Sequence, residues 1–272
     1  MASGAGPIWR RYLVKKENQE SLGQIDFAFK VMSITAIFGL FTPFFSPFYI
    51  QGNPIYLFLL ALLCGMFGAG YFISSYVAQK HVEAGITNLV GSISIPVTIL
   101  LASLFLHETL GPMQIMGAAL LLVAMLIISN KHRTKRFHFD KYFLLMVAGG
   151  ISLGCLLVAE RTLQKMTGFS AGTILSWVPQ ATVLGLAVFL TKSKHRYSKK
   201  NIAITGIVSA IGSLSYVILV TVVGNLSLVS AVTTFKVIII FILAAVFLRE
   251  REDMPRKIFG SIVAVIGLIL MK

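Results

Sequence analysis

The chain has 272 residues, of which 56% are hydrophobic and only 12% are charged, and its mean hydropathy is +0.84. Soluble domains carry about 25% charged residues, so this composition excludes an ordinary soluble protein and indicates a polytopic membrane protein. The formal net charge is +14, but the Lys and Arg residues lie in short gaps between apolar runs. Such placement is typical of cytoplasmic loops and argues against nucleic-acid binding.

Apolar runs follow one another along the whole chain and predict nine transmembrane helices. A helix needs about 20 residues to cross the hydrocarbon core, and lipid offers no partner to an open strand edge, so we expect an all-α membrane bundle. The runs are Phe27–Tyr49, Ile55–Val77, Ala84–Leu106, Met113–Ser129, Tyr142–Glu160, Ala171–Thr191, Ile202–Val222, Leu226–Leu248 and Ile258–Met271.

Prolines mark where these runs should bend or stop. Pro43, Pro47, Pro96 and Pro179 fall within runs and are expected to kink or end the helices. Pro255 precedes the last run, and we expect it in the first turn of that helix, where its missing N–H costs nothing.

The basic residues predict the orientation in the membrane. Of the 24 Lys and Arg residues, all but Arg161, Lys165, Lys236 and Lys272 fall at one set of helix ends. The positive-inside rule then places residues 1–26 and the basic loop 131–141 in the cytoplasm, and the carboxyl terminus outside. The sequence predicts a multi-pass protein of a prokaryotic plasma membrane.

A repeat divides the chain into two halves, residues 27–130 and 142–272. The phrase FLHETLGPMQIMG, beginning at Phe105, recurs as FLREREDMPRKIFG, beginning at Phe247. The repeated residues are Glu108, Pro112 and Gly117 in the first copy and Glu250, Pro255 and Gly260 in the second. By the charge pattern the two glutamates lie on opposite sides of the membrane, which indicates an inverted repeat.

The two halves differ at their beginnings. Arg161, Leu163 and Lys165 correspond to Arg11, Leu13 and Lys15, so the first half begins at the tail of a helix whose body is absent. We therefore expect four helices in the first half and five in the second. A mis-set start and a genuine truncation both explain the difference.

The repeat and the segment AGITNLVGSISIPVTILLASLFLHE, which contains Pro96, resemble the EamA type of the drug/metabolite transporter superfamily. The resemblance runs from Phe27 to Met271. It implies ten helices in two inverted halves, with a central cavity lined by the first four helices of each half and with peripheral fifth helices. The absent first helix departs from that pattern and belongs to the expected cavity wall.

Lys236 lies deep in the eighth run, nine residues after Ser227, which is roughly 14 Å along a helix. A lysine at the centre of a span costs about 2.5–3.5 kcal/mol on insertion scales. We expect it to face a cavity, where it pairs with an anionic substrate group or titrates during coupling. Snorkelling and a fixed structural ion pair are the alternatives.

The remaining charged candidates are carboxylates. Glu160 ends the fifth run beside Arg161, so it either partners Lys236 across the cavity, with proton or other ion coupling, or pairs with Arg161. Glu108 and Glu250 each precede a fifth helix, where the helix dipole favours a carboxylate, and we interpret them as structural.

Polar side chains inside the runs complete the candidate substrate site. Besides Lys236 it comprises Thr233, Thr234, Asn88, Ser92, Tyr71, Trp177, Gln180 and Tyr216. Such residues also pack against small neighbours or bond the backbone in membrane helices. Together they predict a modestly polar cavity.

The sequence favours a secondary transporter of small organic metabolites, such as amino acids or drug-like solutes, that works by alternating access. A truncated or partner-dependent subunit without transport activity, and a lipid-flipping or lipid-modifying protein, are the alternatives. No catalytic motif, cofactor site or metal site is predicted; His107-Glu108, for example, has Gly111 where a zinc protease motif needs its second histidine. The expected partners are the lipid bilayer and a small-molecule substrate, with the chain as a monomer or homodimer.

Overall fold

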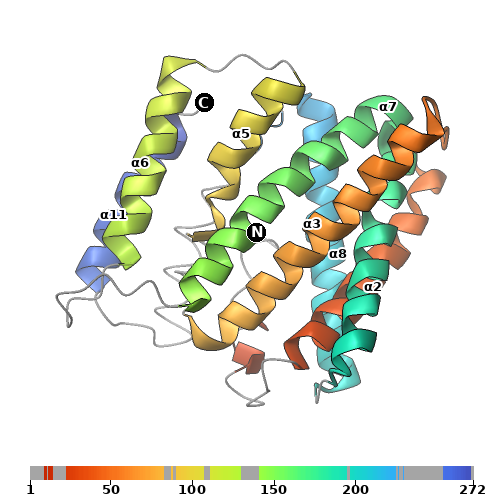
Figure 1. Cartoon of the computed structure of the whole chain (residues 1–272), viewed down its shortest axis with the longest axis horizontal. Coiled ribbons are helices and arrows are strands. Elements are labelled where there is room, and N and C mark those ends of the chain that lie inside the picture. The colour runs from red at the N-terminus through yellow and green to blue at the C-terminus, as the bar shows by residue number, and fades with distance from the viewer. Residues whose placement is uncertain are drawn as a thin grey trace.

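The computed structural model describes residues 9–10, 12–14, 23–82, 87, 90–106, 111–129, 141–194, 197–224, 226, 229 and 254–270. All regular elements in these ranges are helices, as the composition predicts (Figure 1). They are α2 (Gly23–Leu40), η1 (Thr42–Phe44), α3 (Pro54–His81), α5 (Ser94–Phe105), α6 (Pro112–Ser129), α7 (Lys141–Thr191), α8 (Lys199–Val223) and α11 (Met254–Leu270).

Length and composition identify this fold as a multi-pass membrane protein. Four stretches are long and apolar enough to cross a membrane: Gly23–Phe44, which joins α2 and η1, then α3, α7 and α8. The apolar helices Ser94–Phe105 and Ile258–Leu270 are shorter. Of the expected helix Leu226–Leu248, only Leu226 and Val229 belong to the described residues. The number of nine spans therefore stays a prediction.

The first expected helix is shorter than its apolar run. α2 ends at Leu40, and a single 3-10 turn containing Pro43 follows, so the expected continuation to Tyr49 is wrong. Proline lacks the N–H that a continuing helix requires, and two prolines, Pro43 and Pro47, follow Leu40 closely. Residues 45–53 then form a non-helical segment that leads to α3.

Other prolines are tolerated inside or at the beginning of helices. Pro96 lies in the first turn of α5, and Pro255 is the second residue of α11, as the sequence predicts for Pro255. Neither position has an intrahelical acceptor for its N–H. Pro179 lies inside α7, which continues past it to Thr191.

Polar caps fix the beginnings of two spans. The Asn53 side chain accepts a hydrogen bond from the Ile55 backbone N at 2.9 Å, so α3 begins directly after it. Ser198 Oγ accepts from the Asn201 backbone N at 3.2 Å and does the same for α8. Both satisfy N–H groups that have no partner within the helix.

A glycine turn divides α7 into two antiparallel arms. Gly168 has φ 75° and ψ −179°, a conformation open essentially to glycine alone. Trp177 Nε1 donates to Glu160 Oε1 at 2.9 Å, although a straight helix would separate these residues by about 25 Å. The arms, residues 141–167 and 169–191, therefore fold back on each other. The predicted end of the first arm at Glu160 is wrong, because the helix continues to the glycine.

α7 contacts α2, α3, α5 and α8, and its first arm crosses the middle of the bundle in Figure 1. α3 lies along α7, α2 packs on both α7 and α8, and α6 pairs with α11 at one edge. His81 stacks on Tyr142 at 3.7 Å between ring centroids and joins the end of α3 to the beginning of α7. Large apolar side chains such as Phe44 and Phe189 are exposed on the outside, where a bilayer would cover them.

Candidate functional site

Glu160 is the buried acidic residue around which the described polar groups gather. It lies on the first arm of α7 and is only 7% exposed. Its carboxylate accepts the hydrogen bond from Trp177 Nε1, and Ser176 on the second arm is a further neighbour. Because the donors come from the other side of the Gly168 turn, the hairpin positions this carboxylate.

A second set of contacts extends this cluster toward α3. Gln180 Nε2 donates to Ser176 Oγ at 2.9 Å. The Gln180 side chain lies over Gly68 of α3, where an added Cβ would overlap its Cδ. Cys64, one turn earlier on α3, is fully buried and interacts with Ser176 and Glu160. The glycine thus lets α3 approach closely enough to seal one side of the cluster.

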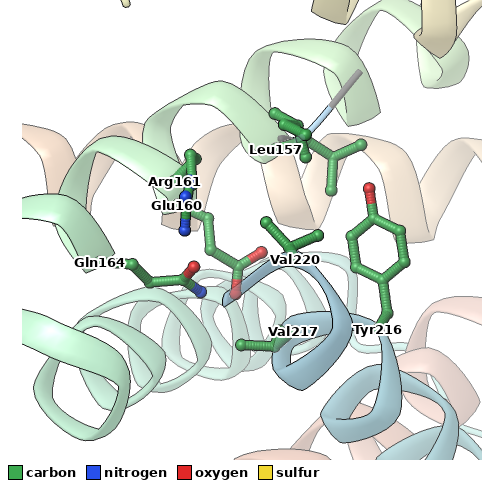
Figure 2. A pocket seen from close by; sticks show the side chains of 8 residues that line it. Leu157, Glu160, Arg161, Gln164, Tyr216, Val217 and Val220 are labelled. Carbon is green, nitrogen blue, oxygen red and sulfur yellow. The ribbon is translucent and has the colours of Figure 1, made fainter. Parts of the chain in front are cut away.

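A narrow cleft opens on the other side of Glu160, between the first arm of α7 and α8 (Figure 2). The cleft has a volume of about 10 Å³, which leaves room for roughly one water. The residues lining it are Leu157, Glu160, Arg161, Gln164, Tyr216, Val217, Val220 and Leu226. Acidic, basic, amide and phenol groups therefore meet in one small space inside the bundle.

Arg161 is the second buried charge of this cleft and is 9% exposed. Its Nη2 donates to the Gly224 carbonyl at 3.2 Å, while its Nε is buried and has no hydrogen-bond partner among the described residues. Gly224 ends α8 in the left-handed conformation, with φ 73°. Within the described residues Arg161 has no carboxylate partner, although Glu160 is its neighbour in sequence.

This arrangement leaves charge only partly compensated. Burying a charge costs free energy unless the group is paired and hydrogen-bonded. Glu160 has an indole donor and Arg161 has one carbonyl acceptor, and the Gln164 amide beside them reaches toward the same space (Figure 2). With room for roughly one water, the cleft has unused hydrogen-bonding capacity for a water, an ion or one polar group of a larger ligand.

The sequence-predicted site residues fall into separate groups. Glu160, Trp177 and Gln180 come together in the cluster, and Tyr216 lines the adjoining cleft. Tyr71 instead packs against Phe72, with 5.3 Å between ring centroids, and Ser92 is buried just before α5. Neither lines the cleft. Four candidates lie outside the described residues: Lys236, Thr233, Thr234 and Asn88.

The residues of the repeated phrase lie away from this cleft. Pro112 begins α6 and Pro255 is in the first turn of α11, while Gly117 and Gly260 are buried in the same two helices. Because α6 and α11 pack on each other, the repeated residues belong to a structural edge of the bundle. Glu108 and Glu250 lie outside the described residues.

Sequence reasoning did not select Arg161, Gln164, Ser176 or Cys64. Arg161 was counted among residues at a helix end, but the helix continues beyond it and buries it. The spacing of Gln164 is the signal that could have identified this group in the sequence. Gln164 follows Glu160 by four residues and Arg161 by three, and residues three and four apart share one face of a helix.

Fold and site together define a helical, multi-pass membrane protein with a small polar cleft. Residues 7–130 match the model of the EamA-like transporter family. The chain is therefore similar to that family over residues 7–130, and this match supports the predicted EamA type of the drug/metabolite transporter superfamily. Members of this family are transporters.

The fold is shared with solved structures. One of them, described only as the crystal structure of a protein, superposes with a TM-score of 0.65 over 99% of this chain and 94% of the other. The two sequences are 14% identical, so this similarity concerns the fold alone. None of the curated proteins matches the chain.

Proposed function

We propose that this chain is a secondary transporter of small organic metabolites, such as amino acids or drug-like solutes, and that it works by alternating access. The observation that carries the proposal is the cleft in which Glu160 and Arg161 are both buried inside a membrane bundle. Ionisable groups within membrane-spanning segments are costly and mark substrate or ion pathways. The match to a transporter family supports the same function.

The moving parts are the two halves, residues 27–130 and 142–272, related as an inverted repeat. Contacts between the halves support this relation: α2 packs on α8, and α3 correspondingly packs on the second arm of α7. Leu13 and Leu163, which correspond in the aligned sequences, are 1% and 0% exposed. Rocking of one half against the other would expose the cleft to each side in turn.

Within this mechanism Glu160 and Arg161 bind the polar groups of the substrate or a coupling ion, and Trp177 orients the Glu160 carboxylate. Tyr216 contributes to the wall of the cleft. Lys236, with Thr233, Thr234 and Asn88, is proposed to face the same cavity from the eighth run. The basic helix ends face the cytoplasm of a prokaryotic cell, and residues 131–141 connect the halves there.

A ligand screen followed by transport measurement tests this function. The purified protein is heated with a library of metabolites, and any compound that raises its Tm is then measured by counterflow in proteoliposomes. We expect a stabilising ligand to exchange across the membrane. Glu160→Gln and Arg161→Gln should each reduce the ligand-dependent rise in Tm. Lys165→Gln is the matched control, because Lys165 lies on the same arm but is exposed.

The outcome of the variants separates the proposal from its alternatives. Counterflow that is unchanged in Glu160→Gln and Arg161→Gln would remove the cleft from the mechanism. Unchanged counterflow in Lys236→Gln, with normal protein abundance, would remove Lys236.

A partner-dependent subunit is the second candidate function, and the burial of α8 favours it. Only 22% of an apolar 18-residue stretch of α8 is buried. The corresponding shares in the other three spans are 44%, 44% and 39%. A helix from another chain would cover this face. Transport by a monodisperse, reconstituted monomer would exclude this candidate.

A further inference from the structure

The amino-terminal residues 9–10 and 12–14 are packed into the bundle, although the sequence predicts a cytoplasmic amino-terminal segment here. Leu13 is 1% exposed and Val14 is buried with it. Leu13 belongs to one apolar cluster with Phe27 of α2, Tyr76 of α3 and Ile202 of α8. A short segment thus contacts three spans at the end of the bundle where α2 and α8 begin and α3 ends (Figure 1).

Neighbouring residues of this segment hold different halves of the protein. Trp9 Nε1 donates to Thr205 Oγ1 on α8, in the second half, at 3.1 Å. The Arg10 guanidinium carbon lies 4.6 Å from the centroid of the Tyr76 ring on α3, in the first half. The segment therefore connects the halves at two adjacent positions.

A second connection between the halves lies at the same level. Gln24 Nε2 at the beginning of α2 donates to the Tyr197 hydroxyl at 2.8 Å. Tyr197 precedes α8, and its ring lies 4.2 Å from that of Phe27, centroid to centroid. Aromatic and hydrogen-bonded contacts thus close this end of the interface between α2 and α8.

The contacts of Arg10 are suited to repeated breaking. Within the described residues its Nε is buried without a hydrogen-bond partner, and no carboxylate pairs with it. The interaction of a guanidinium with an aromatic ring is weaker than that of a buried, hydrogen-bonded ion pair. The segment can therefore separate from α3 without breaking an ion pair between Arg10 and a described carboxylate.

We propose that residues 9–10 and 12–14, together with Gln24 and Tyr197, form an inner gate that holds the two halves together at their basic, cytoplasmic end. The gate is the conformational device of the proposed transporter, and in this respect the inference rests on that function. Opening toward the cytoplasm breaks the Trp9–Thr205 and Gln24–Tyr197 hydrogen bonds and exposes Leu13. These contacts stabilise the closed state whether or not a ligand is bound. Removal of one of them therefore shifts the population toward the open state.

Cysteine accessibility tests the gate without any substrate. Leu13→Cys is placed in a chain that carries Cys64→Ala and Cys155→Ala, and a membrane-impermeant maleimide is applied to the cytoplasmic face of inside-out vesicles. Trp9→Phe keeps an aromatic side chain, although a smaller one, and loses the N–H donor, and Tyr197→Phe loses only the hydroxyl. One hydrogen bond contributes about 0.5–1.5 kcal/mol net, so each change should raise the labelling rate roughly 2- to 12-fold.

Controls make the result specific to the gate. Lys200→Cys lies exposed at the beginning of α8, so it should label rapidly and equally with and without Trp9→Phe. Ile202→Cys, a second buried position of the same cluster, should respond as Leu13→Cys does if the latter folds poorly. Addition of Thr205→Ala to Trp9→Phe should produce no further acceleration, because the two residues share one hydrogen bond.

Two results would overturn the gate: labelling of Leu13→Cys and Ile202→Cys as fast as Lys200→Cys in the otherwise unchanged chain, or rates unaffected by both Trp9→Phe and Tyr197→Phe. Failure of the transport function alone would leave these rates as expected, so the two proposals fail separately.

Discussion

The hairpin at Gly168 gives the most direct physical prediction, through the change Gly168→Ala. With φ 75° and ψ −179° the backbone lies in a region that costs a residue with a Cβ of order 1–3 kcal/mol. The added Cβ would also lie 2.7 Å from Tyr49 Oη and 2.8 Å from Tyr49 Cζ. Since Tyr49 is exposed and can turn aside, the backbone sets most of the cost. We expect a loss of about 3 kcal/mol, which lowers Tm by roughly 6–12 °C at this chain length.

Two other glycines separate the causes of this loss. Gly224 also has positive φ, at 73°, but a Cβ there meets no atom within 4 Å, so Gly224→Ala tests backbone strain alone at roughly 1–2 kcal/mol. Gly91→Ala meets neither strain nor contact and should leave Tm nearly unchanged. Thermal unfolding in detergent, followed by tryptophan emission, compares the three. A Tm for Gly168→Ala equal to that of Gly91→Ala would refute the reasoning that the turn requires glycine.

Three further changes test the cluster and one cap. Trp177→Phe removes the donor to Glu160 and should lower stability by about 1.5–3 kcal/mol, measured as Tm, whereas the same change in a Glu160→Gln chain should cost clearly less; equal costs would mean that the bond contributes nothing. Gly68→Ala should displace Gln180 and weaken binding of any stabilising ligand, read as a smaller rise in its Tm; full retention of the rise would show that the close approach of α3 is not needed. Ser198→Ala removes the cap of α8 and should lower stability by about 1 kcal/mol, and Ser198→Asp should restore it, so an unchanged Tm in both would contradict the capping role.

Much of the helical organisation could be predicted from the sequence because it follows from local chemistry. Long uncharged runs must become helices in lipid, and Pro43 and Pro255 act through their own missing N–H groups. Tertiary contacts determine where some helices end, and the sequence alone did not predict those ends. The first arm of α7 continues past the adjacent charges of Glu160 and Arg161, because partners on the second arm and at the end of α8 receive them.

The candidate site was predictable only in part for the same reason. Glu160, Trp177 and Gln180 attract notice as polar residues in apolar runs, but their meeting depends on the turn at Gly168. The local sequence does not indicate that Gly168, unlike the other glycines of α7, has a positive φ. Arg161 was considered only as a partner of Glu160 and not as a site residue, because a basic residue after a long apolar run resembles the end of a span.

The adjacency of Glu160 and Arg161 explains why both charges remain available to a ligand. Successive residues of a helix point about 100° apart, so neighbouring side chains on one turn do not face each other. Each charge therefore has a hydrogen bond to a different partner: the indole of Trp177 for the carboxylate and the Gly224 carbonyl for the guanidinium. Had the same residues been four apart, they could have neutralised each other and left an inert ion pair. As it is, a small ligand that bridges them would replace water in the cleft with two charge-assisted hydrogen bonds. If the carboxylate and guanidinium act together in this way, the loss of ligand stabilisation in the double variant of Glu160→Gln and Arg161→Gln should fall short of the sum of the two single losses, and additive losses would show that each charge acts alone.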